Sequence, residues 1–504
     1  MTQTLTTAEV KQRSLSGYKW LFSTNVISVP AIYLTTFLLA RTGKETLGVY
    51  ALTQIWVSII MTFVFLGGTT VIRHFTAKLL DATERGKFIS TYLVMLLTAF
   101  LLCLAAALCF PAVSRLLFER EMTLPLALAL TLFALLLIHY EVLQGVTSGL
   151  IDLKGAAVAR MAQFLVPLPV VLVCFVFARD FLRTHTLEIL VGAFSLAYIL
   201  GSIFCLRNIR REGRFSLTPG WHLPPGFWSF MLTTQLATIF TFVYGQVDRI
   251  FVLKIADLAG LGAYQAVLSL QHIVTFAPEI ISPSLVPIFS TLLASGEHHA
   301  LLSMYANLQR LFTILFTILA IFMVAFSHHI LALFGPGYAD YSALLCLFSA
   351  SSVIRCLATP NWAILTSLEK NAYRLSISSL QITIQLVGTF LLIAPFGIYG
   401  IVGSKIGGAI LAQISTLTFI TLFVRRGFGI PPIYWAAVGV TIVLVGIRIL
   451  LGPSPLAHSA GLAGLALIAF WFFGKLSLAE FRQLLSLVLK RTANRPVAVP
   501  AGEE

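Results

Sequence analysis

Long apolar runs, separated by short polar connections, occupy almost the whole chain. Each has about 20 or more residues, which is enough for a helix to cross the hydrocarbon core of a bilayer. The runs are too long for the strands of a barrel, and a helix satisfies every backbone group in lipid. The pattern predicts an all-α polytopic membrane protein with about 14 transmembrane helices, over residues 19–40, 46–72, 88–110, 123–148, 155–178, 187–206, 226–252, 260–290, 306–333, 340–366, 371–395, 398–423, 432–451 and 455–474.

The composition leaves no room for a water-soluble domain. Of the 504 residues, 58% are hydrophobic and only 11% are charged, whereas a soluble protein carries about a quarter charged residues. The polar N-terminus has neither the short apolar region nor the small-residue cleavage site of a signal peptide, so we expect the first span to be retained. The six cysteines lie in apolar runs without a CxxC pair, which indicates lipid-facing or packed thiols.

The net charge of +14 is mainly a signal of orientation. With the N-terminus placed in the cytoplasm, the inside segments hold 23 of the 34 lysines and arginines and the outside segments hold 9. Lys and Arg are enriched in the cytoplasmic loops of membrane proteins. The sequence therefore predicts a multi-pass protein with both termini in the cytoplasm, and it gives no support for binding of nucleic acid.

A short motif occurs twice in the chain at a wide spacing. The sequence LGxY at residues 47–50 returns at residues 261–264, which is an offset of 214. Phe75 and Phe289 keep the same offset at the far ends of these two spans. Six spans separate the copies, so both copies enter the membrane in the same direction. This arrangement predicts a parallel repeat, with two similar halves related by an axis along the membrane normal.

The repeat predicts two six-helix lobes around a central cavity, followed by a terminal helix pair. The expected order is an N-terminal lobe over 1–206, a basic and Pro/Gly-rich cytoplasmic linker over 207–225, a C-terminal lobe over 226–424, the terminal pair over 425–474 and a cytoplasmic tail over 475–504. The tail contains an amphipathic stretch, Lys475–Arg491, which we expect to be an interfacial helix. Two like lobes that rock around a cavity provide alternating access, which favours a transporter over an enzyme.

Five stretches spread over spans one to twelve are similar to segments of a known family. They are LLARTGKETLGVYAL (Leu38–Leu52), FLGGTTVIRHFTAKL (Phe65–Leu79), ALFGPGYADYSALL (Ala332–Leu345), LEKNAYRLSISSLQ (Leu368–Gln381) and APFGIYGIVGSKIGGAI (Ala394–Ile410). In this order they resemble the polysaccharide-biosynthesis and O-antigen flippases of the multidrug/oligosaccharidyl-lipid/polysaccharide (MOP) exporter superfamily. No single stretch is specific to that family, but the ordered set is.

The resemblance implies a flippase of the bacterial inner membrane. Its implied cargo is a polyprenyl-diphosphate-linked oligosaccharide, turned from the cytoplasmic to the periplasmic leaflet. Its implied partners are this lipid-linked substrate, membrane lipids and the polymerase or assembly proteins of polysaccharide synthesis. Drug exporters and peptidoglycan-precursor flippases share the fold. The first span has only Lys19 at its start as a basic residue, which favours a polysaccharide cargo over a peptidoglycan precursor.

Polar and charged residues within the apolar runs are the candidates for function. A charge at mid-membrane costs about 2.5–3.5 kcal/mol on insertion scales. A diphosphate needs cations facing a wet cavity, and the planar fork of arginine binds phosphate oxygens at two points. The candidate substrate-binding residues are Arg249, Arg355, Lys405, Gln54, Gln246 and Gln271, and the candidate ion-coupling residues are Glu141, Glu279 and Asp248.

Each candidate also has a purely structural interpretation. Arg249 forms a local pair with Asp248 in that case, and Arg355 pairs with a carboxylate such as Glu279. Lys405 stands among glycines and a serine, so it snorkels towards an interface from a close helix contact. The glutamines form hydrogen bonds between helices.

Other functions stay open on the sequence. A cation-coupled multidrug exporter needs a carboxylate-rich pocket in the first lobe, and the first span has no acidic residue. A membrane polysaccharide polymerase or ligase needs a catalytic outer loop or paired carboxylates, and the outer loops are short. Walker A, GxSxG and HExxH motifs are absent. We therefore expect a non-enzyme without cofactor or metal, driven by an ion gradient, the membrane potential or consumption of the cargo.

Overall fold

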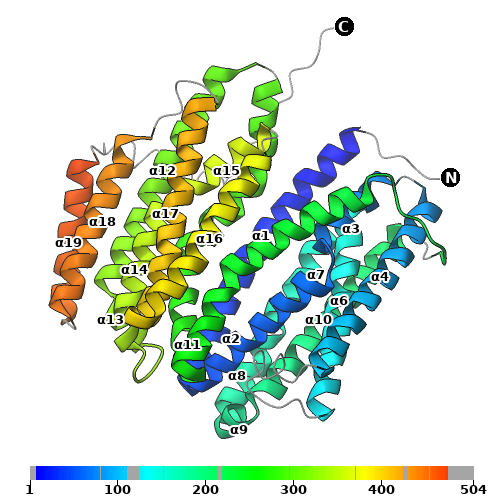
Figure 1. Cartoon of the computed structure of the whole chain (residues 1–504), viewed down its shortest axis with the longest axis horizontal. Coiled ribbons are helices and arrows are strands. Elements are labelled where there is room, and N and C mark those ends of the chain that lie inside the picture. Colours follow the sequence, from blue (N-terminus) through cyan, green and yellow to red (C-terminus); the bar gives the residue numbers. More distant parts are fainter. Residues whose placement is uncertain are drawn as a thin grey trace. The chain divides into compact units, whose positions relative to one another are not determined.

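The structure is a computed structural model, and it describes residues 7–79, 81–109, 124–150, 152–212, 218–294, 296–368, 371–423, 430–452 and 455–474. The described residues form helices joined by short connections, with no β-strand among them (Figure 1). The prediction of an all-α protein is thereby confirmed. The stretch Lys475–Arg491, predicted as an interfacial helix, lies outside the described residues.

The helices lie over the predicted apolar runs, but their bounds differ: the first helix begins at Thr7, and the runs 46–72, 155–178 and 340–366 are each divided between separate helices. Up to residue 294 the helices are α1 (Thr7–Thr42), α2 (Lys44–Ile59) with a π-helical turn η1 (Ile60–Val64), α3 (Gly68–Lys78), α4 (Ala82–Cys109), α6 (Leu124–Gly149), α7 (Leu153–Leu165), α8 (Pro167–Phe177), α9 (Arg179–Thr184), α10 (Thr186–Glu212) and α11 (Phe227–Ala294). They continue with α12 (His298–Ala325), α13 (Ser327–Ala332), a short 3-10 turn η2 (Ala339–Tyr341), α14 (Ser342–Ile354), α15 (Ala358–Ser367), α16 (Asn371–Phe396), α17 (Ile398–Phe423), α18 (Pro432–Leu451) and α19 (Leu456–Phe473).

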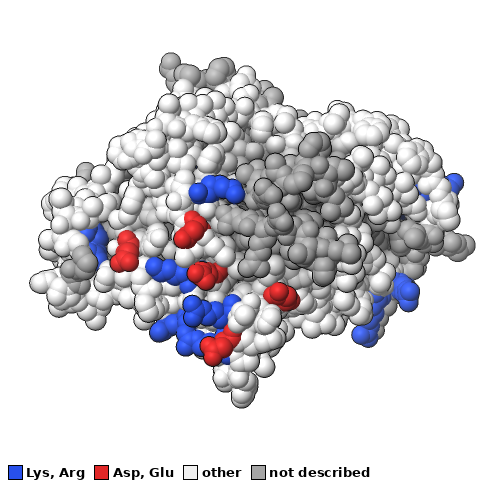
Figure 2. All heavy atoms as spheres, turned by 60° about the horizontal axis from the view of Figure 1, so that its bottom comes forward, with Lys and Arg blue, Asp and Glu red and all other residues white. Residues whose placement is uncertain are grey.

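Twelve helical segments within the described ranges are long and apolar enough to cross a membrane. The helix α1 adds a shorter apolar stretch, Val26–Thr42. On the face shown in Figure 2, Lys, Arg, Asp and Glu are confined to small areas, and the rest of the described surface of that face is uncharged. These observations confirm a multi-pass membrane protein, while the number of fourteen spans stays a prediction.

The helix α11 contains a reversal of the chain that makes it two spans. Its backbone leaves the helical conformation at Ala256 (φ −131°) and Asp257 (φ 59°, ψ −170°). In a straight helix, residues 248 and 264 would be about 24 Å apart, yet the Tyr264 hydroxyl lies 2.6 Å from a carboxylate oxygen of Asp248. The chain therefore folds back between them, and α11 accounts for both the seventh and the eighth predicted span.

The reversal in α11 repeats the break between α1 and α2. Helix α2 begins after Gly43, and the second half of α11 begins after Asp257, which is 214 residues later (257 minus 43). The Asp257 carboxylate accepts a hydrogen bond from the backbone N–H of Gly260 at 2.9 Å and so caps this second half. The two copies of LGxY thus lie at equivalent positions, in the first turns of a helix that enters the membrane after a break.

The two helices that carry the LGxY copies cross at Gly48 and Gly262, and each glycine lies against the backbone of the other helix. A Cβ atom on Gly48 would lie 2.0 Å from the carbonyl oxygen of Leu258, and one on Gly262 would lie 1.9 Å from the carbonyl oxygen of Lys44. Leu258 and Lys44 are themselves 214 residues apart, so the contact is reciprocal. The LGxY motif therefore appears twice because each copy supplies the glycine that lets the other helix approach.

The chain forms two compact units, which are described separately. Unit 1 comprises Met1–Leu270, Leu331–Leu344 and Leu375–Gly408, and unit 2 comprises Gln271–Ile330, Leu345–Arg374 and Ala409–Glu504. The boundaries of the two predicted lobes stay a prediction.

Small residues allow the helices of unit 1 to pack closely. Helix α1 packs against α7 and α8, α10 packs against α6 and α7, and α3 packs against α6. Gly145 and Gly149 of α6, one turn apart, face Ile72 and Thr76 of α3, which are also one turn apart. A Cβ on Gly149 would lie 2.7 Å from the Thr76 side chain. This spacing of small residues is typical of membrane helices whose backbones approach closely.

Unit 2 has an apolar core built around α12. Helix α12 packs against α18 and α19, and the buried side chains Phe312, Phe316 and Phe470 contribute to the core. The Tyr434 hydroxyl on α18 donates a hydrogen bond to the Ile354 carbonyl at 2.9 Å. This bond satisfies one of the carbonyls at the end of α14.

Candidate functional site

A buried carboxylate joins two distant helices of unit 1. Asp248 on α11 has a fully buried side chain, and its Oδ2 accepts hydrogen bonds from the Tyr264 hydroxyl and from Lys405 Nζ, each at 2.6 Å. The Lys405 side chain on α17 is 12% exposed. The second carboxylate oxygen, Oδ1, has no hydrogen-bond partner among the described residues. The carboxylate therefore retains one unused acceptor at the centre of a charged cluster.

Local structure brings these groups together. The reversal after Asp248 returns the chain so that Tyr264 lies beside it. On α17, the neighbour Ser404 is buried and shares a 2.7 Å hydrogen bond with Thr389 of α16. A Cβ on Gly388 would lie 2.8 Å from the Ser404 side chain, so α16 and α17 are in close contact here. The predicted close packing around Lys405 is present, but the lysine extends to Asp248.

A second cation lies beside the pair. Arg249 is 8% exposed, and its Nη1 donates a hydrogen bond to Gln246 Oε1 at 2.9 Å. Its Nε has no partner within the described part of the chain. Arg249 interacts electrostatically with Asp248, Tyr264 and Tyr50. With Lys405, the cluster contains two basic side chains and one acidic side chain.

Aromatic side chains line this charged cluster. Tyr50 and Tyr264 are the tyrosines of the two LGxY copies; Tyr264 donates a hydrogen bond to Asp248, and Tyr50 interacts electrostatically with Arg249. Lys405 Nζ also lies 5.3 Å from the ring centroid of Tyr244, within range of a cation–π contact. Sequence reasoning did not assign the tyrosines to the site, although the repeated motif was the signal that could have indicated them.

A second charged cluster of unit 1 surrounds Glu141. This half-buried residue of α6 interacts electrostatically with Arg160 of α7 and Arg73 of α3. The two arginines are exposed, and they also interact with each other. Sequence reasoning used both arginines only as signals of orientation and missed this cluster, because no local pattern relates the three positions.

The remaining predicted residues lie elsewhere. Gln54 is half-buried on α2, one turn after Tyr50. Gln271 and Arg355 belong to unit 2, where the Gln271 amide lies 3.5 Å from Ser352 Oγ and Arg355, just after α14, is half-buried. The side chain of Glu279 lies outside the described residues. Gln271 thus makes the contact that its structural interpretation predicted, and the roles of all these residues stay predictions.

Another glutamine shows how such residues connect helices. Gln235 on α11 donates to the Thr62 carbonyl at 2.5 Å and accepts from the Gly67 N–H at 2.7 Å. It therefore satisfies two backbone groups where the chain leaves η1. No group of three or more His, Cys, Asp or Glu side chains with the spacing of a metal site occurs in the described part of the chain.

A mainly apolar groove lies between α18 and α19, in unit 2. Its volume is about 620 Å³, and its walls include Ala436, Gly439 and Val443 of α18 with Leu462 and Phe473 of α19. Leu465 and Phe473 are strongly exposed. Every residue that lines the groove has an apolar side chain or is a glycine.

Buried charges within a helical membrane protein are typical of transporters. The fold agrees with known transporter structures. An inward-facing multidrug resistance MATE family transporter of the MOP superfamily matches with a TM-score of 0.61 at 12% identity, covering 80% of this chain and 97% of that one. The lipid II flippase MurJ in an inward closed conformation matches with a TM-score of 0.61 at 11% identity, covering 92% and 99%. A MOP superfamily transporter from Pyrococcus furiosus matches with a TM-score of 0.55 at 12% identity, covering 82% and 98%.

These identities are low, so the likeness establishes the fold of the MOP superfamily. The sequence profile of the polysaccharide biosynthesis protein family matches residues 14–293, which is more than half of the chain. The chain therefore belongs to the polysaccharide biosynthesis protein family. A comparison with curated protein sequences gave no match. Family and fold together support a transporter or flippase of the MOP type.

Proposed function

We propose that this protein is a flippase that moves a polyprenyl-diphosphate-linked oligosaccharide from the cytoplasmic to the periplasmic leaflet of a bacterial inner membrane by alternating access. The observation that carries the proposal is the buried cluster of Arg249, Lys405 and Asp248, which contains two basic side chains and one acidic side chain. Membership of the polysaccharide biosynthesis family connects that cluster to a glycan cargo. The two lobes and the cytoplasmic position of both termini are part of the proposal.

The cluster has the chemistry of a diphosphate site. The Arg249 fork has an unused Nε, and a guanidinium binds phosphate oxygens at two points. Lys405 is held by Asp248 at 2.6 Å, so a phosphate oxygen that reaches this lysine replaces a carboxylate oxygen. One charge-assisted hydrogen bond is exchanged for another, and the lysine never has to lose its counter-charge. Such an exchange allows the cargo to bind and leave.

The second cluster supplies cations at another level of the membrane. In the proposed orientation, Arg73 lies at the cytoplasmic end of the second span and Arg249 near the outer end of the seventh. The diphosphate therefore meets arginines near both faces, and in each cluster a carboxylate competes with it. We assign Glu141 and Asp248 to this competition and to the coupling of transport to an ion.

The lipid tail of the cargo requires a different surface. An isoprenoid chain is apolar along its whole length and gains by contact with apolar side chains. The groove between α18 and α19 has that character and a volume of about 620 Å³. It therefore suits the tail while the charged head group crosses elsewhere. Gln54, Gln271, Arg355 and Glu279 remain proposed contacts for the sugars, the phosphate or the coupling ion.

The test is complementation of a strain that lacks the gene. Lipid-linked glycan is quantified on each face of the inner membrane with a membrane-impermeant label. The strain receives the wild type, Arg249→Ala, Arg249→Lys or Arg355→Ala, and Arg183→Ala as a control. Arg183 is an exposed arginine at the end of α9, so this control removes a charge far in sequence from the cluster.

The proposal expects cytoplasmic-face glycan to accumulate in the deletion strain and in Arg249→Ala. Arg249→Lys restores transport only in part, because lysine lacks the fork, and Arg183→Ala restores it fully. Unchanged sidedness on deletion refutes the flippase. Full rescue by Arg249→Ala refutes the site but keeps the function. The fold likeness to MurJ makes the peptidoglycan precursor the second candidate cargo, so its sidedness is measured in the same strains, and drug efflux is measured alongside.

A further inference from the structure

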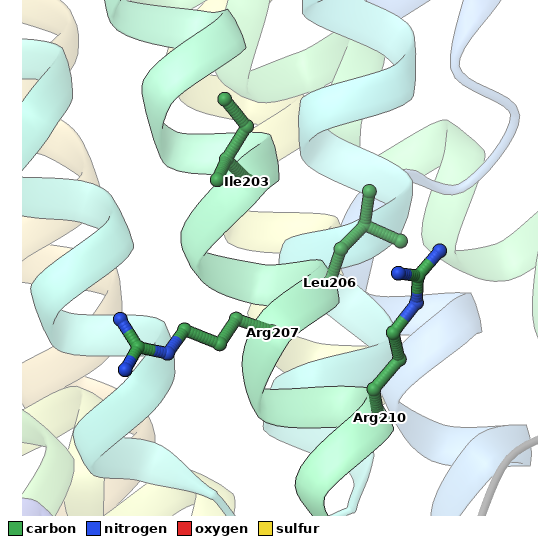
Figure 3. Close-up of a pocket in the computed structure, with 4 residues that line it drawn as sticks. All are labelled: Ile203, Leu206, Arg207 and Arg210. Atoms are coloured by element: carbon green, nitrogen blue, oxygen red, sulfur yellow. The ribbon is translucent and has the colours of Figure 1, made fainter.

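A pocket lies along one face of α10, outside both charged clusters. Its volume is about 520 Å³, and it is lined by Ile203, Leu206, Arg207 and Arg210 (Figure 3). These positions follow the spacing i, i+3, i+4 and i+7, which places them on one face of a helix. The order along that face is apolar first and basic second, towards the end of the helix at Glu212. The pocket therefore changes from apolar to cationic along the helix axis.

The two arginines are available to a ligand. Both are exposed, and neither forms an ion pair or hydrogen bond with any residue in the described ranges. Figure 3 shows their side chains extending to opposite sides of α10, with Leu206 beside Arg210. Both side chains are exposed, so they can turn towards each other over the face of α10 to contact one head group.

We propose that this face of α10 binds an anionic phospholipid of the cytoplasmic leaflet. The phosphate lies between Arg207 and Arg210, and an acyl chain lies against Ile203 and Leu206. The distribution of basic residues places this end of α10 at the cytoplasmic surface, where anionic lipids attract basic residues next to a membrane span. The site rests on the membrane orientation of the proposed function but not on its cargo.

Charge complementarity selects the anionic lipid over a neutral one. A zwitterionic head group carries its own ammonium, which repels the guanidinium groups and offsets the attraction of its phosphate. Arginine is also weakly hydrated and binds phosphate oxygens with a planar fork. A basic residue near an anionic membrane surface contributes about 1 kcal/mol, which is roughly a fivefold change in affinity.

The test uses the full chain purified in a neutral detergent. Its thermal midpoint is followed during titration with dioleoylphosphatidylglycerol or dioleoylphosphatidylcholine, at low and high salt. The variants are Arg207→Gln, Arg210→Gln and their combination, with Arg183→Gln as the matched control. A further variant, Arg207→Lys/Arg210→Lys, keeps the charge and the aliphatic stems.

We expect phosphatidylglycerol to stabilise the wild type at lower concentration than phosphatidylcholine. Its apparent affinity falls about fivefold for each arginine replaced by glutamine and falls with salt, while Arg183→Gln behaves as the wild type. The proposal is overturned if the double glutamine variant keeps wild-type affinity, or if both lipids act equally on the wild type. If the glutamine variants do not fold, the test uses the salt dependence of phosphatidylglycerol binding by the wild type and by Arg207→Lys/Arg210→Lys. A stabilisation by phosphatidylglycerol that does not change with salt overturns the site.

Discussion

The ion pair between Lys405 and Asp248 gives the sharpest test of the site. Replacing Lys405 by methionine keeps the length of the side chain and removes its charge. Asp248 is then left with the Tyr264 hydroxyl as its hydrogen-bond donor and with Arg249 as a nearby cation. Replacing Asp248 by asparagine instead leaves two cations without a carboxylate between them. The double variant, Asp248→Asn/Lys405→Met, removes both charges.

The expected magnitudes follow from burial. The Asp248 side chain is fully buried and that of Lys405 is 12% exposed, with 2.6 Å between their charged atoms. Removing one partner of a buried pair costs about 3–5 kcal/mol, because the other charge is left uncompensated. We place Lys405→Met at about 3 kcal/mol, since Arg249 still attracts the carboxylate, and Asp248→Asn nearer to about 5 kcal/mol. The double variant should cost less than the two single variants combined, because neutral replacements of a buried pair are often tolerated, although Arg249 is then left without its carboxylate neighbour.

The assay is a double-mutant cycle on the purified chain. Unfolding is followed by tryptophan fluorescence during titration with sodium dodecyl sulfate, in one detergent and at one temperature. The seven tryptophans of the chain provide the signal. The coupling free energy is the cost of the double variant minus the costs of the two single variants.

Additive costs would contradict the reasoning. If the double variant is as unstable as the two single variants combined, the charges do not depend on each other and the ion pair is not formed in the native protein. If all three variants are as stable as the wild type, the charges are not buried. Transport is measured in parallel on the same variants. The double variant should regain part of the stability but should not flip the cargo, because it lacks Lys405, which is proposed to bind phosphate.

Three further predictions follow from the geometry. Gly262→Ala should destabilise the protein by about 1–3 kcal/mol, because the added Cβ meets a backbone carbonyl at 1.9 Å. Gly192→Ala on α10 has nothing within 4 Å of the added Cβ and should stabilise the protein by about 0.5–1 kcal/mol. Thermal unfolding compares the two variants, and equal effects would contradict the close helix crossing at Gly262. Tyr264→Phe should cost about 1.5–3 kcal/mol through the lost hydrogen bond to a carboxylate, and an unchanged unfolding midpoint would show that the bond is absent. Gly439→Leu fills open space in the apolar groove, so it should lower flipping in the sided-glycan assay at unchanged stability, and wild-type flipping would exclude the groove from the path of the tail.

The repeat is the part of the fold that the sequence indicated most directly. Two LGxY copies at an offset of 214 predicted equivalent helices, and the structure places each at the start of a helix after a break. What the sequence could not show is that the glycines Gly48 and Gly262 touch the opposite backbone. A repeat in one sequence identifies equivalent positions but not which of them meet.

The candidate site was predicted in part. Asp248, Arg249 and Lys405 were selected because a charge within an apolar run is costly, and Gln246 because its amide could bind the sugars; the structure brings all four together. Arg355 was selected by the same rule, yet it belongs to unit 2. The rule identifies costly residues one at a time, so it cannot show which of them share a cavity.

By itself, the sequence determined that this is a helical, multi-pass membrane protein with an internal repeat and a few buried charges. Those conclusions depend on local hydropathy and composition, which bilayer thickness and backbone hydrogen bonding translate directly into helices. Only the tertiary structure decided that Lys405 meets Asp248 across 157 residues and that Glu141 interacts electrostatically with Arg73 and Arg160. The physical reason is that lipid and protein interior are both apolar, so these helices carry no amphipathic pattern to reveal which face is turned inward.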